Sequence, residues 1–175
     1  FSEARGTVYA SSRVETVLGY SPDHLYKNPW LWDRSIHPDA RDRIAQAIAE
    51  FAAGQDLDVE YRIKDASGNW RWLHDRSIGR RMEGEETIIE GISTDITDRV
   101  RAEEALREEH ANLLAIMEIT EDLIAVRDRA ERLVYFNTAF AQLVPKLFGV
   151  EAQYGLKTTD YLPPEQGAHW EHVLG

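Results

Sequence analysis

Apolar residues recur at every second position in some segments of the chain, as in a strand, and every three to four positions in others, as in a helix. Apolar and polar residues alternate from Leu57 to Ile63, which predicts a strand with one buried face. Two further strands are expected at 70–81 and 87–97, each preceded by a polar turn that contains glycine. These segments predict an antiparallel meander of three strands. A shorter alternating segment, Thr7 to Ser11, predicts another strand near the N-terminus.

Apolar residues at helical spacing occupy much of the chain before the meander. A short helix is expected at 12–19, because it ends in a glycine and its apolar residues share one face. Ser21 followed by Pro22 predicts the start of a second helix, and a longer helix is expected from Pro38 to Gly54. Helices packed on one face of an antiparallel sheet define the predicted fold class, which is α+β.

Residues 98–119 predict a single connector helix, because arginine, glutamate, alanine and leucine dominate this segment. Its apolar stripe is interrupted by Glu109 and His110, so it is shorter than a sustained coiled coil. Two interpretations remain open: the stripe is a dimer seam, or it packs onto its own module. The stripe consists of Ala102, Leu106, Leu113 and Ile116.

The chain contains an internal repeat. Residues 8–12 resemble residues 134–138, and residues 36–39 resemble residues 162–165, with the same offset of 126 positions in both cases. We therefore predict a tandem array with three parts. They are a first module at 1–97, the connector helix at 98–119, and the N-terminal half of a second module at 120–175.

Composition and charge narrow the class of protein. A hydrophobic content of 43% is typical of a folded domain, and a net charge of −11 disfavours nucleic acid as a partner. No apolar run approaches the roughly 20 residues that cross a bilayer, so no membrane contact is expected for this fragment. The absence of cysteine removes disulfides and thiolate chemistry and favours a reducing, cytoplasmic location.

No catalytic residue or metal site is predicted. The chain has no phosphate-binding glycine loop, nucleophile elbow or zinc-protease helix. Glu165, His169 and His172 have the spacing of ligands on one helical face, but a solvated acidic helix explains them equally well and no second ligand helix is evident. His37 is expected to cap a helix, and His74 to lie on a strand with solvent exposure.

The motifs around the meander resemble a known sensory family. A glycine turn at Gly68 precedes Trp70 and Trp72, and the last strand ends in Asp95-Ile96-Thr97 before a charged helix. This order resembles the C-terminal, PAC-type half of a PAS sensory domain. The resemblance implies the strand order 2-1-5-4-3, with a first strand that lies mostly before residue 1. That strand would be disordered, removed or supplied by another chain.

The resemblance also implies where a signal would leave the sheet. Asp95, Ile96 and Thr97 are the expected relay residues: the two polar side chains brace the turn between strand and helix, while Ile96 points into the core. A nearby arginine is expected to pair with Asp95, and Arg99 is one candidate. An ordinary helix cap explains the same triplet, and the two interpretations are compatible.

Four tryptophans are candidates for the wall of a ligand cavity. Trp70 and Trp72 lie on one side of their strand, where they line a cavity or pack on the face of the sheet. Trp30 and Trp32 flank a segment that often borders the cavity in PAS domains and is expected to be a loop. These residues identify no particular cofactor or ligand.

The resemblance implies a sensory, non-catalytic function. A PAS module of this kind senses a small molecule, a cofactor or a partner, and passes the result through its C-terminal helix to an output domain in the same chain. The expected assembly is a homodimer, and the expected output is a histidine kinase, although His110 lacks the flanking residues of a phosphorylated histidine. The alternatives are a sensor for a diguanylate cyclase, a ligand-free dimerisation module, and a flavin or haem redox sensor.

Overall fold

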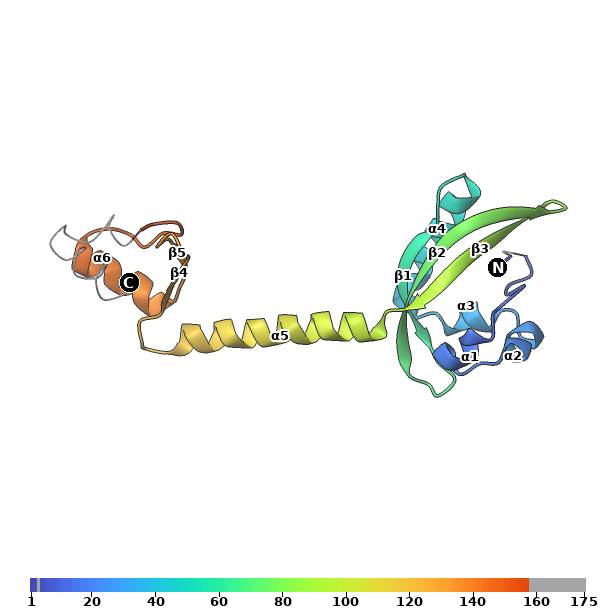
Figure 1. Cartoon of the computed structure of the whole chain (residues 1–175), viewed down its shortest axis with the longest axis horizontal. Helices are drawn as coiled ribbons and strands as arrows, with labels where there is room; N and C mark the ends of the chain where they lie inside the picture. The colour runs from blue at the N-terminus through green and yellow to red at the C-terminus, as the bar shows by residue number, and fades with distance from the viewer. Residues whose placement is uncertain (3, 158–175) are drawn as a thin grey trace. The chain divides into compact units, whose positions relative to one another are not determined.

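The computed structural model describes residues 1–2 and 4–157 of the chain. These residues belong to two compact units, Phe1–Glu104 and Ala105–Gly175, and the second unit is described as far as residue 157. Figure 1 shows the elements of each unit. Within the described residues, none of the helices has the length and apolar character that a bilayer crossing requires.

The first unit begins with short helices and continues into a meander. The helices α1 to α4 are Arg13–Leu18, Pro22–Lys27, Leu31–Ser35 and Arg41–Ala52, and a 3-10 helix, Pro38–Ala40, precedes α4. The strands β1 to β3 are Asp58–Lys64, Trp70–Glu83 and Glu86–Asp95, and the helix α5, Thr97–Ile119, follows and continues into the second unit.

The three strands form an antiparallel sheet in the order β1-β2-β3, so the predicted meander is confirmed. Tyr61 of β1 lies opposite Leu73 of β2, which in turn lies opposite Asp95 of β3. Residues directly opposite one another share a face of the sheet. Gly91 fits where β3 bends past a bulge in β2, because a Cβ there would lie 2.7 Å from the carbonyl oxygen of Arg76.

Helices cover one face of this sheet. Val59, Tyr61 and Ile63 alternate along β1 and are all buried, as the period of two predicts. They belong to one hydrophobic cluster with Leu18 of α1 and Phe51 of α4. The α+β class expected from the sequence is therefore confirmed.

Helix ends in the first unit follow the expected capping chemistry. The Ser21 hydroxyl accepts a hydrogen bond from the His24 backbone N–H, and Pro22 occupies the first turn of α2. Gly19 ends α1 with φ of 73°, the left-handed conformation that favours glycine. His37 caps the 3-10 helix, because its ring nitrogen accepts from the Asp39 backbone N–H.

Two local predictions were wrong. The segment from Thr7 to Ser11 is not a strand: Thr7 donates its backbone N–H to the Pro29 carbonyl instead. The corresponding segment of the second unit, in contrast, pairs with residues 125–127. The segment that contains Trp32 is the helix α3 rather than a loop.

The free edge of β3 carries one short contact with the N-terminus. Phe1 and Ile89 exchange two backbone hydrogen bonds of 2.8 and 2.9 Å, and Ser2 forms a bridge with Ile88. The N-terminal residues therefore lie at the edge of β3, beside the strand that precedes α5.

The second unit contains a small hairpin and one helix. The strands β4, Ala125–Arg127, and β5, Leu133–Phe136, pair in antiparallel fashion, and α6, Thr138–Phe148, follows directly. Asn137 caps α6 by accepting a hydrogen bond from the Phe140 backbone N–H. A strand followed by a helix was expected here from the repeat.

Candidate functional site

The junction between β3 and α5 is joined to the central strand of the sheet. The Thr97 hydroxyl accepts the backbone N–H of Trp72 at 2.9 Å, and the Ile96 backbone N–H donates to the Trp72 carbonyl, also at 2.9 Å. Ile96 and Thr97 are 8% and 2% exposed, so both bonds lie away from solvent. The start of α5 is therefore hydrogen-bonded to both the backbone N–H and the backbone carbonyl of Trp72 in β2.

Asp95 has a structural role at the same junction. One of its carboxylate oxygens accepts the Thr97 backbone N–H at 2.9 Å, so Asp95 satisfies a donor in the first turn of α5. The other oxygen lies 3.5 Å from the Arg71 guanidinium. The sequence interpretation placed both polar residues of the triplet at this turn, and the structure brings them together there.

Arg71 links the junction to the turn between β1 and β2. Its guanidinium also lies 3.1 Å from the carboxylate of Asp65, whose residue is only 5% exposed. Burial alone would raise the pKa of Asp65, but hydrogen bonds from the Asn69 N–H, Arg71 and the Ser67 N–H together lower it below its ordinary value. Asp65 therefore stays ionised and holds Arg71 toward Asp95.

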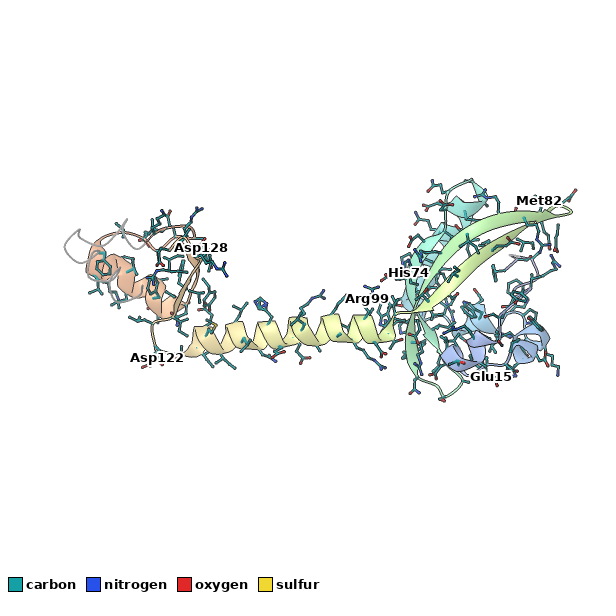
Figure 2. The ribbon with its side chains drawn as sticks, viewed as in Figure 1. Glu15, His74, Met82, Arg99, Asp122 and Asp128 are labelled. Atoms are coloured by element: carbon teal, nitrogen blue, oxygen red, sulfur yellow. The ribbon has the colours of Figure 1, made fainter. Side chains whose placement is uncertain are left out.

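The arginine beside Asp95 is Arg71, and not the candidate Arg99 that the sequence suggested. Arg99 instead pairs with Glu60 of β1 at 2.6 Å and with Glu103 one turn along α5 at 3.1 Å (Figure 2). The helix turns the Arg99 side chain toward β1, whereas Arg71 lies on β2 on the same face of the sheet as Asp95. The error arose because the distant residue Arg71 cannot be recognised from local spacing.

The four candidate tryptophans do not form one cavity wall. Trp70 and Trp72 point to the face of the sheet opposite the core, since their cross-strand partners Lys64 and Arg62 alternate with buried residues. The Arg62 guanidinium lies 5.7 Å from the Trp72 ring, and the Lys64 ammonium lies 5.3 Å from the Trp70 ring. Sheet-face packing is thus the role that the structure gives this pair.

Trp30 and Trp32 also separate from each other. Trp30 is 39% exposed and precedes α3, whereas Trp32 packs against the core cluster. The indole N–H of Trp32 donates to the Tyr61 hydroxyl at 2.8 Å, and that hydroxyl donates to a carboxylate oxygen of Asp75 at 2.6 Å. Of the four candidates, Trp32 is the one whose polar atom joins a network on the core face.

The Asp75 carboxylate is an unusual group for such a position. Its second oxygen is buried and has no hydrogen-bond partner. Burial raises the pKa of Asp75 above its ordinary value, although the hydroxyls of Ser93 and Tyr61 and the nearby His74 oppose this shift. The sequence analysis missed this residue, because alternation predicts an inward side chain at this position but not its partners.

A hollow in the described surface lies at the other edge of the sheet. An open groove of about 310 Å³ runs between α4 and β1, and Arg43, Glu50 and Glu60 lie along it. Arg43 donates to the backbone carbonyl of Glu60 across this groove. The groove opens to solvent and does not enclose a ligand.

The apolar stripe of α5 is exposed in the single chain. Leu106, Leu113 and Ile116 are 68%, 54% and 61% exposed, and Ala102 is exposed as well. Packing of the stripe onto its own module, one of the two interpretations, is not seen for these residues.

The end of α5 is held by two residues that sequence reasoning missed. Glu118 accepts hydrogen bonds from the Thr138 backbone N–H, the Thr138 hydroxyl and the Tyr135 hydroxyl, at 2.8 to 3.0 Å. Asn137 is fully buried, and its amide donates to the carbonyls of Met117 and Asp122. The repeat marked the position of Asn137, but only tertiary structure reveals its contact with α5.

No group of histidine and acidic residues suited to a metal ion occurs among the described residues. Glu165, His169 and His172 lie outside the described residues. His74 pairs with Asp58 at 2.6 Å and is half-buried, on the face opposite Leu73 (Figure 2). His110 lies exposed on α5.

Comparison with known proteins identifies a matching family model and several relatives that are similar in sequence. A family model described as PAS fold matches residues 7–93. The methyl sulfide methyltransferase-associated sensor of Methanosarcina acetivorans is 37% identical over 92 residues, which are 51% of this chain and 9% of the relative. The blue-light-activated histidine kinase of Brucella ovis is 29% identical over 98 residues, or 56% of this chain and 19% of that kinase.

One solved structure of a sensory protein is similar to this chain in fold and sequence. The sensory box histidine kinase/response regulator from Burkholderia thailandensis matches with a TM-score of 0.50 and 28% identity, over 66% of this chain and 87% of the solved chain. The present chain spans less than a fifth of the length of the two curated relatives.

Proposed function

The chain belongs to the PAS fold family through residues 7–93, and from this premise we propose that it is a sensory fragment that passes a signal from its sheet into α5. The module at 1–97 would be the sensor, 98–119 the connector, and 120–175 the first half of a second PAS module. The output is a domain elsewhere in the same protein. A histidine kinase is the favoured output, because two similar proteins carry that name.

One observation carries this proposal: the first turn of α5 is hydrogen-bonded to the centre of the sheet. Because Ile96 and Thr97 both bond to Trp72, a displacement of β2 changes the contacts of α5 directly. A stimulus acts through its different affinities for two conformations, and coupling of about 1 to 3 kcal/mol is typical of such systems. Asp95 and Arg71 would hold the junction in one of those conformations.

The test requires the full-length protein and an assay of its output, such as autophosphorylation. Thr97→Val keeps the shape of the side chain but removes the hydroxyl that accepts from Trp72. We expect a changed basal output or stimulus response, together with a loss of about 1 kcal/mol in the free energy of unfolding. Thr94→Val is the matched control, because Thr94 is exposed on β3. Equal output from both variants and the unmodified protein would reject the relay.

A second function is favoured by a different observation. The stripe of α5 is exposed, and the groove beside β1 is open, so a PAS unit used only for dimerisation is the alternative. Native mass spectrometry of the freshly purified chain distinguishes the two. A dimer that carries an additional small-molecule mass supports sensing by ligand, whereas a dimer of unmodified mass supports the assembly function.

The remaining alternatives concern output and location. A diguanylate cyclase in place of the kinase would be revealed by cyclic di-GMP production by the full-length protein. We propose a cytoplasmic location for this fragment, on the basis of its acidic, cysteine-free composition. A flavin or haem would give visible absorbance in the purified protein.

A further inference from the structure

A hydrogen-bonded chain of side chains crosses the core face of the sheet from α3 to β3. The Trp32 indole N–H donates to the Tyr61 hydroxyl at 2.8 Å, and that hydroxyl donates to one carboxylate oxygen of Asp75 at 2.6 Å. Ser93 of β3 lies directly opposite Asp75, and its hydroxyl bonds to the same carboxylate. The chain therefore joins one helix to all three strands of the sheet.

The Asp75 carboxylate lies between the core and the solvent. Its second oxygen is buried and has no hydrogen-bond partner among the described residues. Asp75 as a whole is half-buried, whereas Ser93 beside it is exposed. An ionised carboxylate with an unpaired buried oxygen is unfavourable, and either a proton or a bound water molecule removes that cost. The solvent next to Ser93 can supply both.

From this geometry we infer that Asp75 is the group through which the first unit senses protons. Neutral Asp75 suits the closed site, and ionised Asp75 draws water to its second oxygen beside Ser93. The inference rests on the proposed relay for its effect on α5. It deepens that proposal by naming the proton as a stimulus.

Loss of the proton changes the chain at both of its ends. A hydrogen bond to an ionised acceptor is roughly twice as strong as a bond between neutral groups, so ionisation tightens the Tyr61 bond and draws on Trp32 of α3. At the other end, hydration of the carboxylate acts on β3 at Ser93, which shortly precedes Asp95 of the junction. The proton therefore biases the strand that leads into α5.

The charged groups along the core face of β2 have other partners. Arg71 lies 3.5 Å from the carboxylate of Asp95, and the Arg80 guanidinium lies 4.3 Å from the ring centre of Phe51 on α4. Among the described residues, no arginine or lysine forms a salt bridge with Asp75. A change in the proton occupancy of this carboxylate is therefore a change in unpaired charge.

His74 is the titratable neighbour whose effect must be separated from that of Asp75. It follows Leu73 on β2, faces the other side of the sheet and pairs with Asp58 at 2.6 Å. Burial raises the pKa of Asp75 and outweighs the hydroxyls of Ser93 and Tyr61 and the charge of His74, which lower that pKa. Asp75 is therefore neutral at the ordinary pKa of an aspartate and ionises as the pH rises above it.

Carbon-13 NMR of the aspartate carboxyls in the 175-residue chain tests the proton site. Between pH 4 and pH 8, one carboxyl resonance that is absent from Asp75→Asn should titrate with a midpoint above the ordinary aspartate pKa. The indole N–H resonance of Trp32, assigned with Trp32→Phe, should shift with the same midpoint, because Tyr61 links the two groups. A midpoint at the ordinary value would overturn the inference.

Three variants identify the titrating group and its contacts. Asp75→Asn should abolish the pH-dependent shift of the Trp32 indole N–H, and His74→Gln should leave that shift in place. The reverse result would assign the response to His74 and overturn the inference. Ser93→Ala removes a hydroxyl that lowers the pKa of Asp75, so the midpoint should rise further. An unchanged midpoint in Ser93→Ala would reject the route to β3.

The proton site and the relay fail separately. If both hold, the backbone N–H resonance of Trp72, which bonds to Thr97, shifts with the midpoint of Asp75, and Asp75→Asn removes that shift. If Trp32 follows Asp75 but Trp72 does not, the effect of the proton on α5 is rejected. If Thr97→Val changes the output of the full-length protein while Asp75 titrates at the ordinary value, the relay stands and the proton is not its stimulus.

Discussion

At the scale of single residues, the most informative group is the Asp75 carboxylate. It lies on the core face of the sheet, accepts a hydrogen bond from Tyr61 and leaves one oxygen without a donor. A buried acceptor without a partner is uncommon in folded proteins. The hydrophobic cluster beside it contains no other carboxylate, so this side chain is expected to make the stability of that cluster depend on pH.

The first prediction concerns Asp75→Asn. Because burial raises the pKa of Asp75 in the folded state, the native protein binds its proton more tightly than the unfolded chain does. The contribution of Asp75 to the free energy of unfolding is therefore greatest below the ordinary pKa of an aspartate. It falls as the pH rises from that ordinary pKa to the raised pKa of the folded state. An asparagine side chain cannot ionise, so we expect Asp75→Asn to raise the free energy of unfolding at pH 7 by about 1 kcal/mol.

Urea unfolding at pH 4 and pH 7 measures this effect as the difference between variant and unmodified protein. Asp56→Asn is the control, because Asp56 is exposed before β1. A gain for Asp75→Asn that is the same size at both pH values would contradict the assigned cause.

The second prediction concerns the hydroxyl between Trp32 and Asp75. Tyr61→Phe removes both an acceptor for the indole N–H and the donor to the carboxylate, and leaves two buried groups unpaired. We expect a loss of about 2 to 3 kcal/mol in the free energy of unfolding at pH 7. Tyr20→Phe is the matched control, because the Tyr20 hydroxyl makes a weak contact of 3.4 Å near the surface. Equal losses in chemical denaturation would exclude a special role for this network.

At the scale of elements, the strands were easier to predict than their connections. The alternation around Tyr61 specified both the strand and its buried face, because one side of the sheet packs against helices. The helix α3 was missed, since its five residues contain no complete apolar period. The segment from Thr7 to Ser11 has the composition of a strand, but it pairs with no strand among the described residues.

The same limit applies to the candidate site. The triplet Asp95 to Thr97 was found from local order, and the Asp95 carboxylate does accept the Thr97 backbone N–H at the turn. Arg71 and Asp65 were not found, because their contact with the junction depends on the pairing of strands distant in sequence. Sequence reasoning therefore located the junction but not the residues that brace it.

The third prediction tests the attachment of α5 to the second unit. Asn137→Ala removes two donors to the carbonyls of Met117 and Asp122 and two acceptor contacts with backbone N–H groups. We expect the second unit to lose about 2 to 3 kcal/mol of stability, seen as faster hydrogen exchange of residues 117–140. Asn137→Asp, which keeps the acceptor oxygen, should give a smaller loss.

The comparison variant is Asn112→Ala, whose side chain lies exposed on α5. Exchange in residues 58–95 of the first unit should remain unchanged in all three variants. Unaltered exchange near Met117 in Asn137→Ala would show that this side chain does not hold the end of α5.

At the scale of the whole molecule, the chain divides into two compact units, Phe1–Glu104 and Ala105–Gly175, and the boundary between them falls within α5. The sheet holds the start of α5 through Thr97, and Glu118 and Asn137 hold its end. Residues 101–116, in the middle of the helix, are all exposed. The proposed dimer would form along this middle segment.

The fourth prediction belongs to this scale. Leu113→Glu should weaken dimerisation at least as strongly as Leu106→Glu, because each places a charge in the seam. Arg107→Glu, which changes charge at a position outside the seam, should have a much smaller effect. Analytical ultracentrifugation of the three variants at equal concentration gives the comparison, and similar assembly states throughout would place the interface elsewhere.

The attachment of α5 to a single residue of the central strand has a consequence for how a signal can be graded. The amide and the carbonyl of Trp72 both serve the first turn of the helix, so sliding β2 along its own axis lengthens both hydrogen bonds together. Strand positions repeat every two residues, and a smaller slide leaves neither bond in place. In the relay that we propose, the junction would therefore have two states, engaged and released, and a weak stimulus would alter the fraction of molecules in each state rather than the angle of the helix in all of them.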